Sequence, residues 1–263
     1  MIIMPINEGE TVYLSDPSGK KIWLKVSYSM LKIGALGTLD GKRFMDLDDG
    51  SRMNIAGKEY TVFRPGVLEL MGSLDRGAQI ITPKDAATII LNCDVGPGRT
   101  VLEVGAGSGG LTTALLNAVG NEGKVHTLEF KEENIQRTMK NLCRTGLEKR
   151  WSSTLGDARN TRIDFMADAL IMDMPDPWLA LDNLYDNLRS GGRLCAYVPN
   201  TNQAESIVTA LREKGFEDVH ALENLQRGLE VHPGGVRPSF EMLGHTGYLI
   251  FGRKTEISSP KRT

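Results

Sequence analysis

The sequence predicts an α/β protein with a mixed, mostly parallel sheet, preceded by a small N-terminal antiparallel β domain. Over residues 1–65, short apolar runs alternate with turn residues, which is typical of antiparallel strands. From residue 66 to 255, strand patterns alternate with longer helical patterns, which is typical of parallel strands joined by helices on both faces. We therefore expect domains at residues 1–65 and 66–255, and a flexible tail at 256–263.

The first domain is predicted to consist of short strands. Residues 11–15 and 21–27 flank Asp-Pro-Ser-Gly, a sequence typical of a turn between two strands. Further apolar runs lie at residues 33–36, 44–47 and 60–63. Arg64-Pro65-Gly66 marks the predicted boundary.

The second domain is predicted from alternating periodicities. We expect strands at residues 100–104, 124–129, 168–174, 193–198 and 247–251, and helices at residues 109–119, 131–145 and 202–214. Asn202 and Glu205 have the spacing of a capping box, and Gly146 and Gly215 are placed to end two helices. In a sheet of this kind, ligands bind at the carboxyl ends of the strands.

Composition limits the possible functions. The chain has 263 residues, of which 40% are apolar and 24% charged, as expected for a soluble globular protein. Lys plus Arg is 31 and Asp plus Glu is 33, so the net charge of −2 excludes a histone-like polycation but leaves nucleic-acid binding through a local basic patch. Three cysteines without CxxC spacing predict neither a disulfide framework nor a zinc site, and we expect no metal. The absence of a secretory signal or a membrane-length apolar run predicts a cytoplasmic protein.

A glycine-rich segment joins the first strand of the second domain to a helix. In Val-Leu-Glu-Val-Gly-Ala-Gly-Ser-Gly-Gly (101–110), the glycines allow a tight turn and close approach to a ligand. Glu129 ends the next strand, where a carboxylate accepts both ribose hydroxyls of a nucleoside. Asp157 follows a third strand and either accepts a hydrogen bond from an adenine amino group or caps a helix. A glycine turn without a ligand is the alternative.

Two nucleoside cofactors fit this pattern, NAD and S-adenosylmethionine. The loop resembles the ExGxGxG motif of class I (Rossmann-like) methyltransferases, in which Glu103 would reach the amino group of the methionine moiety. A pyrophosphate next to Glu103 would be repelled, so S-adenosylmethionine is favoured. The expected cofactor-binding residues on these segments are Glu103, Gly105, Ala106, Gly107, Ser108, Gly109, Gly110, Leu111, Glu129, Asp157, Ala158 and Asp173.

The acceptor side of the site is predicted at Asp-Met-Pro-Asp-Pro-Trp (173–178), which ends the fourth strand. The two prolines stiffen the backbone and fix the direction of Asp173. Trp178 either offers an aromatic plane to the acceptor or packs in the core. A carboxylate on a rigid edge suits a planar acceptor that carries an amino group.

These motifs together resemble the tRNA (adenine-N1)-methyltransferases that modify T-loop adenine 58. The resemblance extends over Gly-Ala-Gln-Ile-Ile-Thr-Pro-Lys-Asp (77–85), Tyr-Val-Pro-Asn-Thr-Asn-Gln (197–203) and Met-Leu-Gly-His-Thr-Gly-Tyr-Leu (242–249). It implies tRNA as the partner, a homotetramer, an N-terminal domain that contacts RNA, and Gln79 in a segment that closes over the cofactor. Thr82 stands where the family usually has tyrosine. Whether adenine 57 is also modified stays open.

The resemblance implies two catalytic residues. Asp173 would stabilise the positive charge that develops on the adenine when N1 is methylated. Tyr197 would hold the edge of the base, although a strand tyrosine in the core is the alternative, and His245 either contacts RNA or stabilises its turn. The expected basic cluster for RNA, or else a solvated helix face, comprises Arg137, Lys140, Arg144, Lys149 and Arg150.

Two other functions stay open at this point. A protein or small-molecule methyltransferase, such as a protein isoaspartyl methyltransferase, would share residues 98–130 but not the motif at 173–178. A non-catalytic tRNA-binding subunit would keep the fold without the acidic residues. Because Glu129, Asp157 and Asp173 are all present, an active enzyme is favoured.

Overall fold

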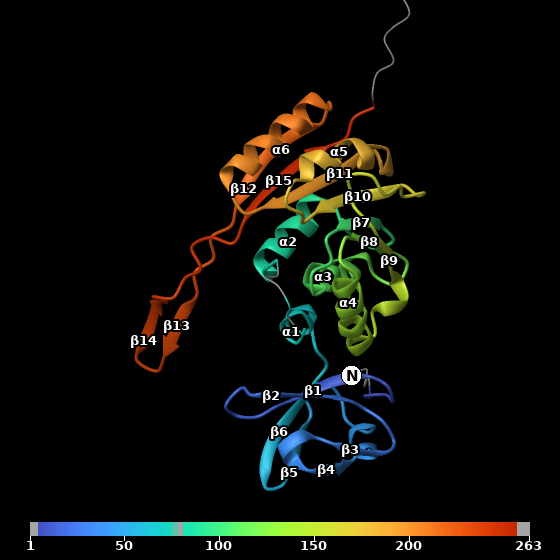
Figure 1. The fold of residues 1–263 in the computed structure, drawn as a ribbon. Helices are drawn as coiled ribbons and strands as arrows, with labels where there is room; N and C mark the ends of the chain where they lie inside the picture. The colour runs from blue at the N-terminus through green and yellow to red at the C-terminus, as the bar shows by residue number, and fades with distance from the viewer. Residues whose placement is uncertain (1–4, 76, 78–80, 257–263) are drawn as a thin grey trace, which may run out of the picture. The chain divides into compact units, whose positions relative to one another are not determined.

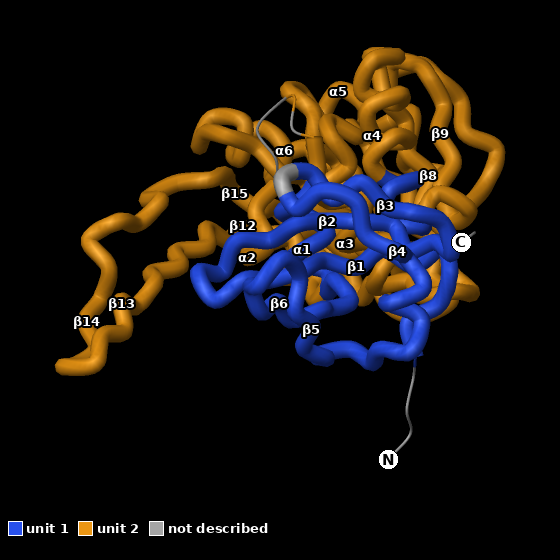
Figure 2. Tube along the Cα trace, turned by 90° about the horizontal axis from the view of Figure 1, so that it is seen from below, with its two compact units in different colours: residues 1–73, 142–146 blue, residues 74–141, 147–263 orange. Residues whose placement is uncertain are grey.

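The computed structural model describes residues 5–75, 77 and 81–256. The chain divides into two compact units, which are residues 1–73 with 142–146 and residues 74–141 with 147–263 (Figure 2). The first unit thus reaches past the predicted boundary at residue 65. The division into domains at residues 1–65 and 66–255 stays a prediction. Of the predicted tail, residues 257–263 lie outside the described residues.

The first unit is built on a four-stranded antiparallel sheet with the strand order β2-β1-β6-β5 (Figure 1). Its strands are β1 (Thr11–Ser15), β2 (Lys21–Lys25), β5 (Arg52–Ile55) and β6 (Lys58–Phe63), and a separate pair is formed by β3 (Met30–Lys32) and β4 (Thr38–Asp40). A short helix, α1 (Val67–Gly72), follows β6. The antiparallel N-terminal sheet agrees with the prediction.

Two of the strands predicted in this unit are wrong. Residues 33–36 contain a 3-10 helix, Gly34–Leu36, instead of a strand. Residues 44–47 begin at the end of a second 3-10 helix, Gly41–Phe44, and continue without strand structure. Ile33 and Phe44 are apolar because they pack in the core of this unit, where Phe44 is fully buried. A short apolar run does not distinguish a strand from a buried turn, and the packing decides.

The second unit contains a seven-stranded sheet with the order β12-β15-β11-β10-β7-β8-β9. The strands are β7 (Thr100–Val104), β8 (Lys124–Glu129), β9 (Trp151–Leu155), β10 (Ala167–Met172), β11 (Leu188–Val198), β12 (Glu217–Glu223) and β15 (Tyr248–Arg253). The five strands from β11 to β9 are parallel, and β15 pairs antiparallel with β11 and β12. The predicted mixed, mostly parallel sheet is confirmed.

Helices cover both faces of this sheet (Figure 1). They are α2 (Pro83–Asn92), α3 (Gly110–Val119), α4 (Glu132–Thr145), α5 (Pro177–Leu184) and α6 (Thr201–Glu213). The pair α2 and α3 packs on one face, and α5 with α6 on the other. The predicted capping pair of α6 is wrong, because Asn200 is the N-cap and its side chain accepts from the Gln203 amide at 3.0 Å.

A two-stranded hairpin, β13 (Leu229–His232) and β14 (Gly235–Pro238), extends away from the large sheet (Figures 1 and 2). Leu229, Val231 and Val236 on this hairpin, and Phe240 after it, are exposed apolar side chains. In the part of the chain that the structure describes, no helix has the length and apolarity needed to cross a bilayer.

Candidate functional site

The glycine loop connects β7 to α3 and touches the end of β10. The Asp173 amide donates to the Val104 carbonyl at 2.8 Å, which brings the two strand ends together. Gly105 has a φ of +90°, and a Cβ at this position would lie 2.2 Å from the carbonyl oxygen of Asp173. Only glycine satisfies both conditions. Gly109, at φ +80°, is the N-cap of α3.

We expect Gly105→Ala to destabilise the cofactor-free protein more than Gly107→Ala. Both glycines have positive φ, which costs a side chain about 1–3 kcal/mol. Only at Gly105 does the added Cβ also meet a backbone atom, since nothing lies within 4 Å of a Cβ at Gly107. The free energy of unfolding from denaturant titration measures both. Equal losses of unfolding free energy in the two variants would contradict the close approach of Gly105 to the Asp173 carbonyl.

A pocket of about 500 Å³ lies between the glycine loop and the carboxyl ends of β8, β9 and β10. Six predicted residues line it, namely Gly105, Gly107, Glu129, Asp157, Ala158 and Asp173. The pocket lies where ligands bind in an open α/β sheet. The segments predicted to form one site are therefore brought together by the fold.

Glu129 is almost fully buried beneath the loop. Its Oε2 accepts hydrogen bonds from the amides of Ala106 at 2.8 Å and Gly107 at 3.4 Å, and its Oε1 accepts from the Lys131 amide at 2.8 Å. A carboxylate has about four acceptor positions, so acceptor capacity remains for a ligand hydroxyl. The carboxylate is held in place by the backbone before any ligand binds.

Asp157 is held by Arg159 instead of capping a helix. Residues 158–160 form a turn, so the predicted alternative of a helix cap is wrong. The Arg159 guanidinium donates to the Asp157 carboxylate at 2.7–3.0 Å, and these hydrogen bonds lower the pKa of Asp157. Asp157 therefore lines the pocket as a charged acceptor.

Glu103 lies under the loop and does not line the pocket. Its side chain is fully buried, and its Oε2 accepts from the hydroxyls of Thr112 at 2.7 Å and Thr127 at 2.6 Å. Burial raises the pKa of Glu103 to about 8, so the side chain is mostly protonated at neutral pH. Its Oε1 has no hydrogen-bond partner among the described residues. The predicted contact of Glu103 with the cofactor stays a prediction.

The other predicted cofactor residues are buried behind the loop surface. Ala106, Ser108, Gly109, Gly110 and Leu111 are buried and do not line the pocket, whereas Gly105 and Gly107 are partly exposed. Gln79 lies outside the described residues. The loop thus presents two glycines to the pocket, and the residues between and after them fill the space behind.

Sequence reasoning missed several lining residues, among them Phe130, Lys131, Asn134, Arg159, Met174 and Pro175. Phe130 directly follows Glu129, and 68% of its surface is exposed. An aromatic residue just beyond an acidic strand end is the signal that would have identified it. Such a ring is a suitable surface for a flat base.

Asp173 is half-buried at the end of β10 and lines the pocket. Burial, with a smaller contribution from the charge of Glu129, raises the pKa of Asp173 to about 7. The Pro175 carbonyl next to it accepts from the Gln203 side chain at 2.6 Å, which ties the loop after β10 to α6. Trp178 packs against the hydrophobic core, as the second alternative predicted.

A buried polar cluster fixes the loop that precedes β15. Asp85 on α2 is fully buried, and it accepts from Lys84 at 2.9 Å and from the hydroxyls of Thr82 and Thr246 at 2.8 Å. Burial alone would raise the pKa of Asp85, but these hydrogen bonds lower it. Thr82, where the related family has tyrosine, is therefore a partner of this carboxylate.

Tyr197 contacts the same loop and does not line the pocket. Its hydroxyl donates to the Thr246 carbonyl, and its ring lies against Gly247, where a Cβ would be 2.4 Å from the ring. Burial raises the pKa of Tyr197 to about 12, so it stays protonated. The structure thus places the hydroxyl on the protein backbone, and direct contact with a base stays a prediction.

His245 bridges two strand ends. Its Nδ1 lies 2.7 Å from a carboxylate oxygen of Glu223, and its Nε2 lies 2.8 Å from the Pro199 carbonyl. The contacts with Glu223 and Pro199 raise the pKa of His245. The residue stabilises its turn, and RNA contact stays a prediction.

The pocket fits a cofactor that contains a nucleoside. Glu129 offers acceptor capacity for ribose, Asp157 offers a charged acceptor, and Phe130 offers a flat apolar surface. Gly105 and Gly107 also line the pocket, and they carry no side chain that would cover their backbone. Among the described residues, no group of three or more His, Cys, Asp or Glu side chains gathers in metal-binding geometry.

Comparisons with known proteins identify the family. Residues 69–236 match the family described as tRNA methyltransferase complex GCD14 subunit. This chain belongs to that family. The tRNA (adenine(57)-N(1)/adenine(58)-N(1))-methyltransferase TrmI of Methanocaldococcus jannaschii is 32% identical, and the match covers 91% of this chain and 93% of the relative.

Two solved structures share the fold along nearly the whole chain. The tRNA (m1A58) methyltransferase TrmI of Aquifex aeolicus has a TM-score of 0.75 at 27% identity, with 96% of this chain and all of that chain covered. A protein of Thermotoga maritima, described as a SAM-dependent O-methyltransferase, has a TM-score of 0.81 at 29% identity, with 95% and 94% covered. The predicted fold class, S-adenosylmethionine as the cofactor and the predicted tRNA methyltransferase activity are confirmed.

Proposed function

We propose that this protein transfers a methyl group from S-adenosylmethionine to N1 of adenine 58 in the T-loop of tRNA. The observation that carries the proposal is Asp173, a half-buried carboxyl at the end of β10 that lines the same pocket as the glycine loop. The relatives named for adenine 58 support the position on the tRNA. The cofactor supplies an electrophilic methyl group on its sulfonium sulfur.

The residues that hold the cofactor are proposed from the lining of the pocket. Glu129 accepts hydrogen bonds from the ribose hydroxyls, Asp157 accepts one from the adenine amino group, and Phe130 lies against the adenine ring. Gly105 and Gly107 leave the backbone open to the methionine portion. Glu103 supports the loop from below through the hydroxyls of Thr112 and Thr127.

Asp173 is proposed to act on the acceptor adenine. N1 of adenine carries a free lone pair and needs no base to become a nucleophile. Methylation places a positive charge on the ring, shared between N1 and N6. An ionised Asp173 next to N6 stabilises that charge more in the transition state than in the ground state, which accelerates the reaction.

Tyr197 is proposed as a positioning residue. Its hydroxyl donates a hydrogen bond to the Thr246 carbonyl, and the Thr246 hydroxyl donates one to the Asp85 carboxylate. The chain from Asp85 to Tyr197 thereby fixes the 244–247 loop beside the end of β11. Because the Tyr197 hydroxyl donates its single proton to Thr246, direct contact with a base would use only its oxygen as an acceptor.

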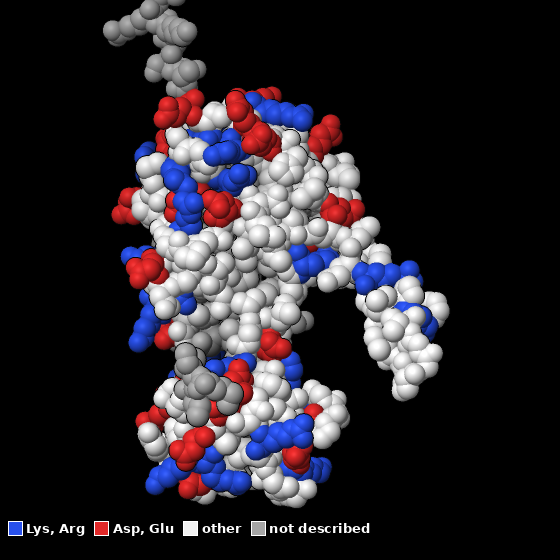
Figure 3. Space-filling model, turned by 180° about the vertical axis from the view of Figure 1, so that it is seen from behind, with Lys and Arg blue, Asp and Glu red and all other residues white. Residues whose placement is uncertain are grey.

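The tRNA-binding surface is proposed to be a local feature, because Lys, Arg, Asp and Glu are intermixed over the face in Figure 3. Arg150, a member of the predicted basic cluster, is not part of the proposed tRNA-binding surface. The Arg150 guanidinium donates to the carbonyls of Leu116, at 2.6 Å, and Gly120, so it anchors the end of α3. Lys140 pairs with Asp75 at 3.3 Å. Arg144 and Lys149 remain exposed.

The protein is also proposed to be a homotetramer in the cytoplasm. The hairpin of β13 and β14 is mostly uncharged in Figure 3 and exposes Leu229, Val231 and Val236. Exposed apolar surface of this kind marks contacts with other chains. We expect light scattering to give a mass of about four chains, or about 116 kDa from four times 28.9 kDa. A monomer at micromolar concentration would contradict this part of the proposal.

A methyl-transfer assay tests the function. Unmodified tRNA and labelled S-adenosylmethionine are incubated with the protein, and nucleoside analysis locates the label. The proposal predicts 1-methyladenosine at position 58, which the same transcript with a substitution at that position does not form. Label at position 57 as well would extend the activity to both adenines. Label in protein or on a hydroxyl group would contradict the proposal.

A further inference from the structure

The outer face of the four-stranded sheet carries aromatic and basic side chains. In β1 and β2, Thr11 is opposite Lys25 and Tyr13 is opposite Trp23. Because successive side chains alternate between the two faces of a strand, these four residues share one face. Val12 and Leu14 point the other way, into the core. The Tyr13 and Trp23 ring centroids are 5.4 Å apart, so Tyr13 supports Trp23 from the side.

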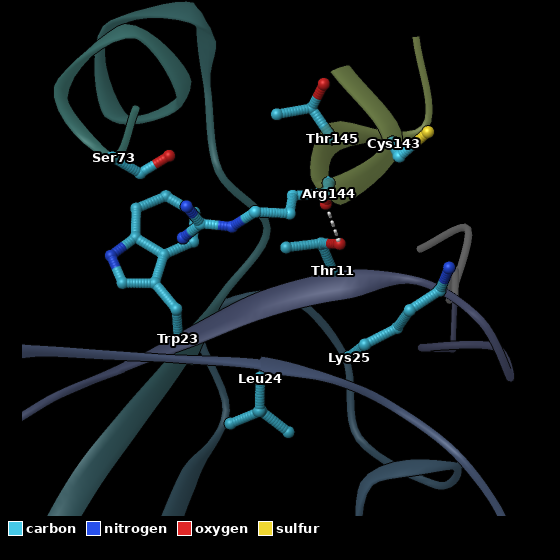
Figure 4. A pocket seen from close by; sticks show the side chains of 8 residues that line it. All are labelled: Thr11, Trp23, Leu24, Lys25, Ser73, Cys143, Arg144 and Thr145. Carbon is cyan, nitrogen blue, oxygen red and sulfur yellow. Dashed lines mark hydrogen bonds between the residues drawn. The ribbon is translucent and has the colours of Figure 1, made fainter. Parts of the chain in front are cut away.

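A pocket of about 290 Å³ lies over this face, within the first compact unit (Figure 4). It is lined by Thr11, Trp23, Leu24, Lys25, Ser73, Cys143, Arg144 and Thr145. In Figure 4 the Arg144 side chain extends toward Trp23. No carboxylate lines the pocket among the residues that the structure describes.

Its two cations are available for a ligand. Neither the Lys25 ammonium nor the Arg144 guanidinium forms an ion pair or a hydrogen bond with another described residue. By contrast, Lys21 on the same face is paired with Glu69 at 3.1 Å. Arg144 extends toward the partly exposed indole of Trp23, whereas Lys25 extends away from it (Figure 4). Two unpaired cations in this arrangement suit successive phosphates that flank a flat ring.

The hydroxyls in the wall restrict the ligand further. Thr11 donates to the Arg144 carbonyl at 2.7 Å, Ser73 to the Leu70 carbonyl at 2.9 Å, and Thr145 to the Leu142 carbonyl at 2.9 Å. Each hydroxyl has used its single proton, so all three offer only lone pairs to a ligand. They accept from an exocyclic amino group or from a ribose 2′-hydroxyl.

We propose that this pocket binds one unstacked nucleotide of the tRNA, with the base beside Trp23 and the two phosphates that flank it at Arg144 and at Lys25. The inference rests on the proposed tRNA substrate and adds a second contact, away from the cofactor pocket. Binding a nucleotide here helps to compensate for the unstacking that the T-loop must undergo before N1 of its adenine is accessible.

The first test compares variants in tRNA binding and in turnover. We expect Lys25→Gln with Arg144→Gln to raise the KM for tRNA about tenfold or more and to lower the slope of log Kd against log salt by about one to two. Trp23→Ala should weaken tRNA binding about five- to a hundredfold. The kcat at saturating tRNA and the affinity for S-adenosylmethionine should stay unchanged in the double variant. The matched control is Lys58→Gln, which alters an exposed lysine of the same sheet.

The second test uses Cys143, the exposed cysteine in the pocket wall, whereas Cys93 and Cys195 are buried. We expect unmodified tRNA to slow alkylation of Cys143 by iodoacetamide about tenfold or more, and S-adenosylmethionine to have no effect. Protection by adenosine monophosphate but not by tRNA would overturn the proposal in favour of a free-nucleotide site. Protection that rises with protein concentration alone would overturn it in favour of an interface between copies.

The outcomes separate this inference from the proposed function. If the wild-type protein methylates tRNA while the double variant keeps the wild-type KM and salt slope, the pocket is not part of the RNA site and only the inference fails. If the wild-type protein does not methylate tRNA, the proposed function fails. Protection of Cys143 then shows whether RNA binds the pocket at all.

Discussion

Replacing Asp173 by Asn is expected to lower kcat for tRNA methylation by about 100- to 1000-fold. The amide keeps the size and one acceptor oxygen of the side chain but removes the charge that stabilises the methylated adenine. Loss of a single electrostatic group of this kind costs about 2.7–4 kcal/mol. We expect the affinity for S-adenosylmethionine to change less than about tenfold, as measured by calorimetric titration. Near wild-type turnover would remove Asp173 from the mechanism.

The pH dependence of turnover provides a second measurement of the same residue. Burial raises the pKa of Asp173 to about 7, and only the ionised form stabilises a positive charge. The kcat/KM of the wild-type protein should therefore rise with pH and level off above about 7. Asp173→Asn should lose this rise. A wild-type profile that is flat between pH 6 and 8 would show that the catalytic group titrates elsewhere.

The raised pKa of Asp173 also makes the free energy of unfolding depend on pH. Turnover rises with pH, whereas the contribution of Asp173 to stability falls. The folded state holds the Asp173 proton more tightly than the unfolded chain, whose pKa is close to 3.8. The contribution of this residue to the free energy of unfolding is therefore complete below about pH 4 and decreases as the pH rises to about 7. Asp173→Asn removes that decrease. Denaturant titrations of both proteins at pH 5 and 8 measure the difference.

Replacing Glu129 by Ala should weaken binding of both S-adenosylmethionine and its demethylated product by about ten- to a hundredfold. A charge-assisted hydrogen bond to a ribose hydroxyl contributes about 1.5–3 kcal/mol. The carboxylate also accepts from the amides of Ala106, Gly107 and Lys131, so its loss loosens the loop as well. Calorimetry with each ligand measures the effect.

Two controls separate the causes. Glu129→Gln keeps one acceptor oxygen but presents an amino group to backbone donors, so it should weaken binding nearly as much as alanine. Glu133→Gln changes an exposed carboxylate on α4 and should leave the affinity unchanged. If Glu129→Ala binds S-adenosylmethionine as the wild type does, the ribose is held by another residue.

Much of the site was predictable because its chemistry is local in sequence. A tight turn needs its glycines wherever it folds, and the carboxyl ends of parallel strands converge on one edge of the sheet. Gly105, Glu129, Asp157 and Asp173 could therefore be assigned to one site from their positions in the sequence, and all four line the same pocket. Helices α3, α4 and α6 and the central strands of the second unit followed from their periodicity, whereas α2, α5, β12 and the hairpin of β13 and β14 were not predicted.

The first unit was harder to predict. Ile33 and Phe44 have the apolar character of strand residues, yet they belong to turns that pack into the core. At the start of α6 three residues in Asn-Thr-Asn, 200–202, could cap the helix, and backbone conformation selected Asn200. Apolar character and capping ability are local properties, whereas the choice among several equivalent positions depends on distant packing.

The sequence by itself determined the α/β fold, the glycine loop and the acids around it, because backbone geometry and strand order leave few places for those residue types. The tertiary structure alone decided where the remaining side chains go. It placed Glu103 beneath the loop, the Tyr197 hydroxyl on Thr246 and the Arg150 guanidinium on the end of α3. It also placed Trp23 beside Arg144 in one pocket. A long polar side chain reaches several partners, and the fold determines which partner lies within hydrogen-bond distance.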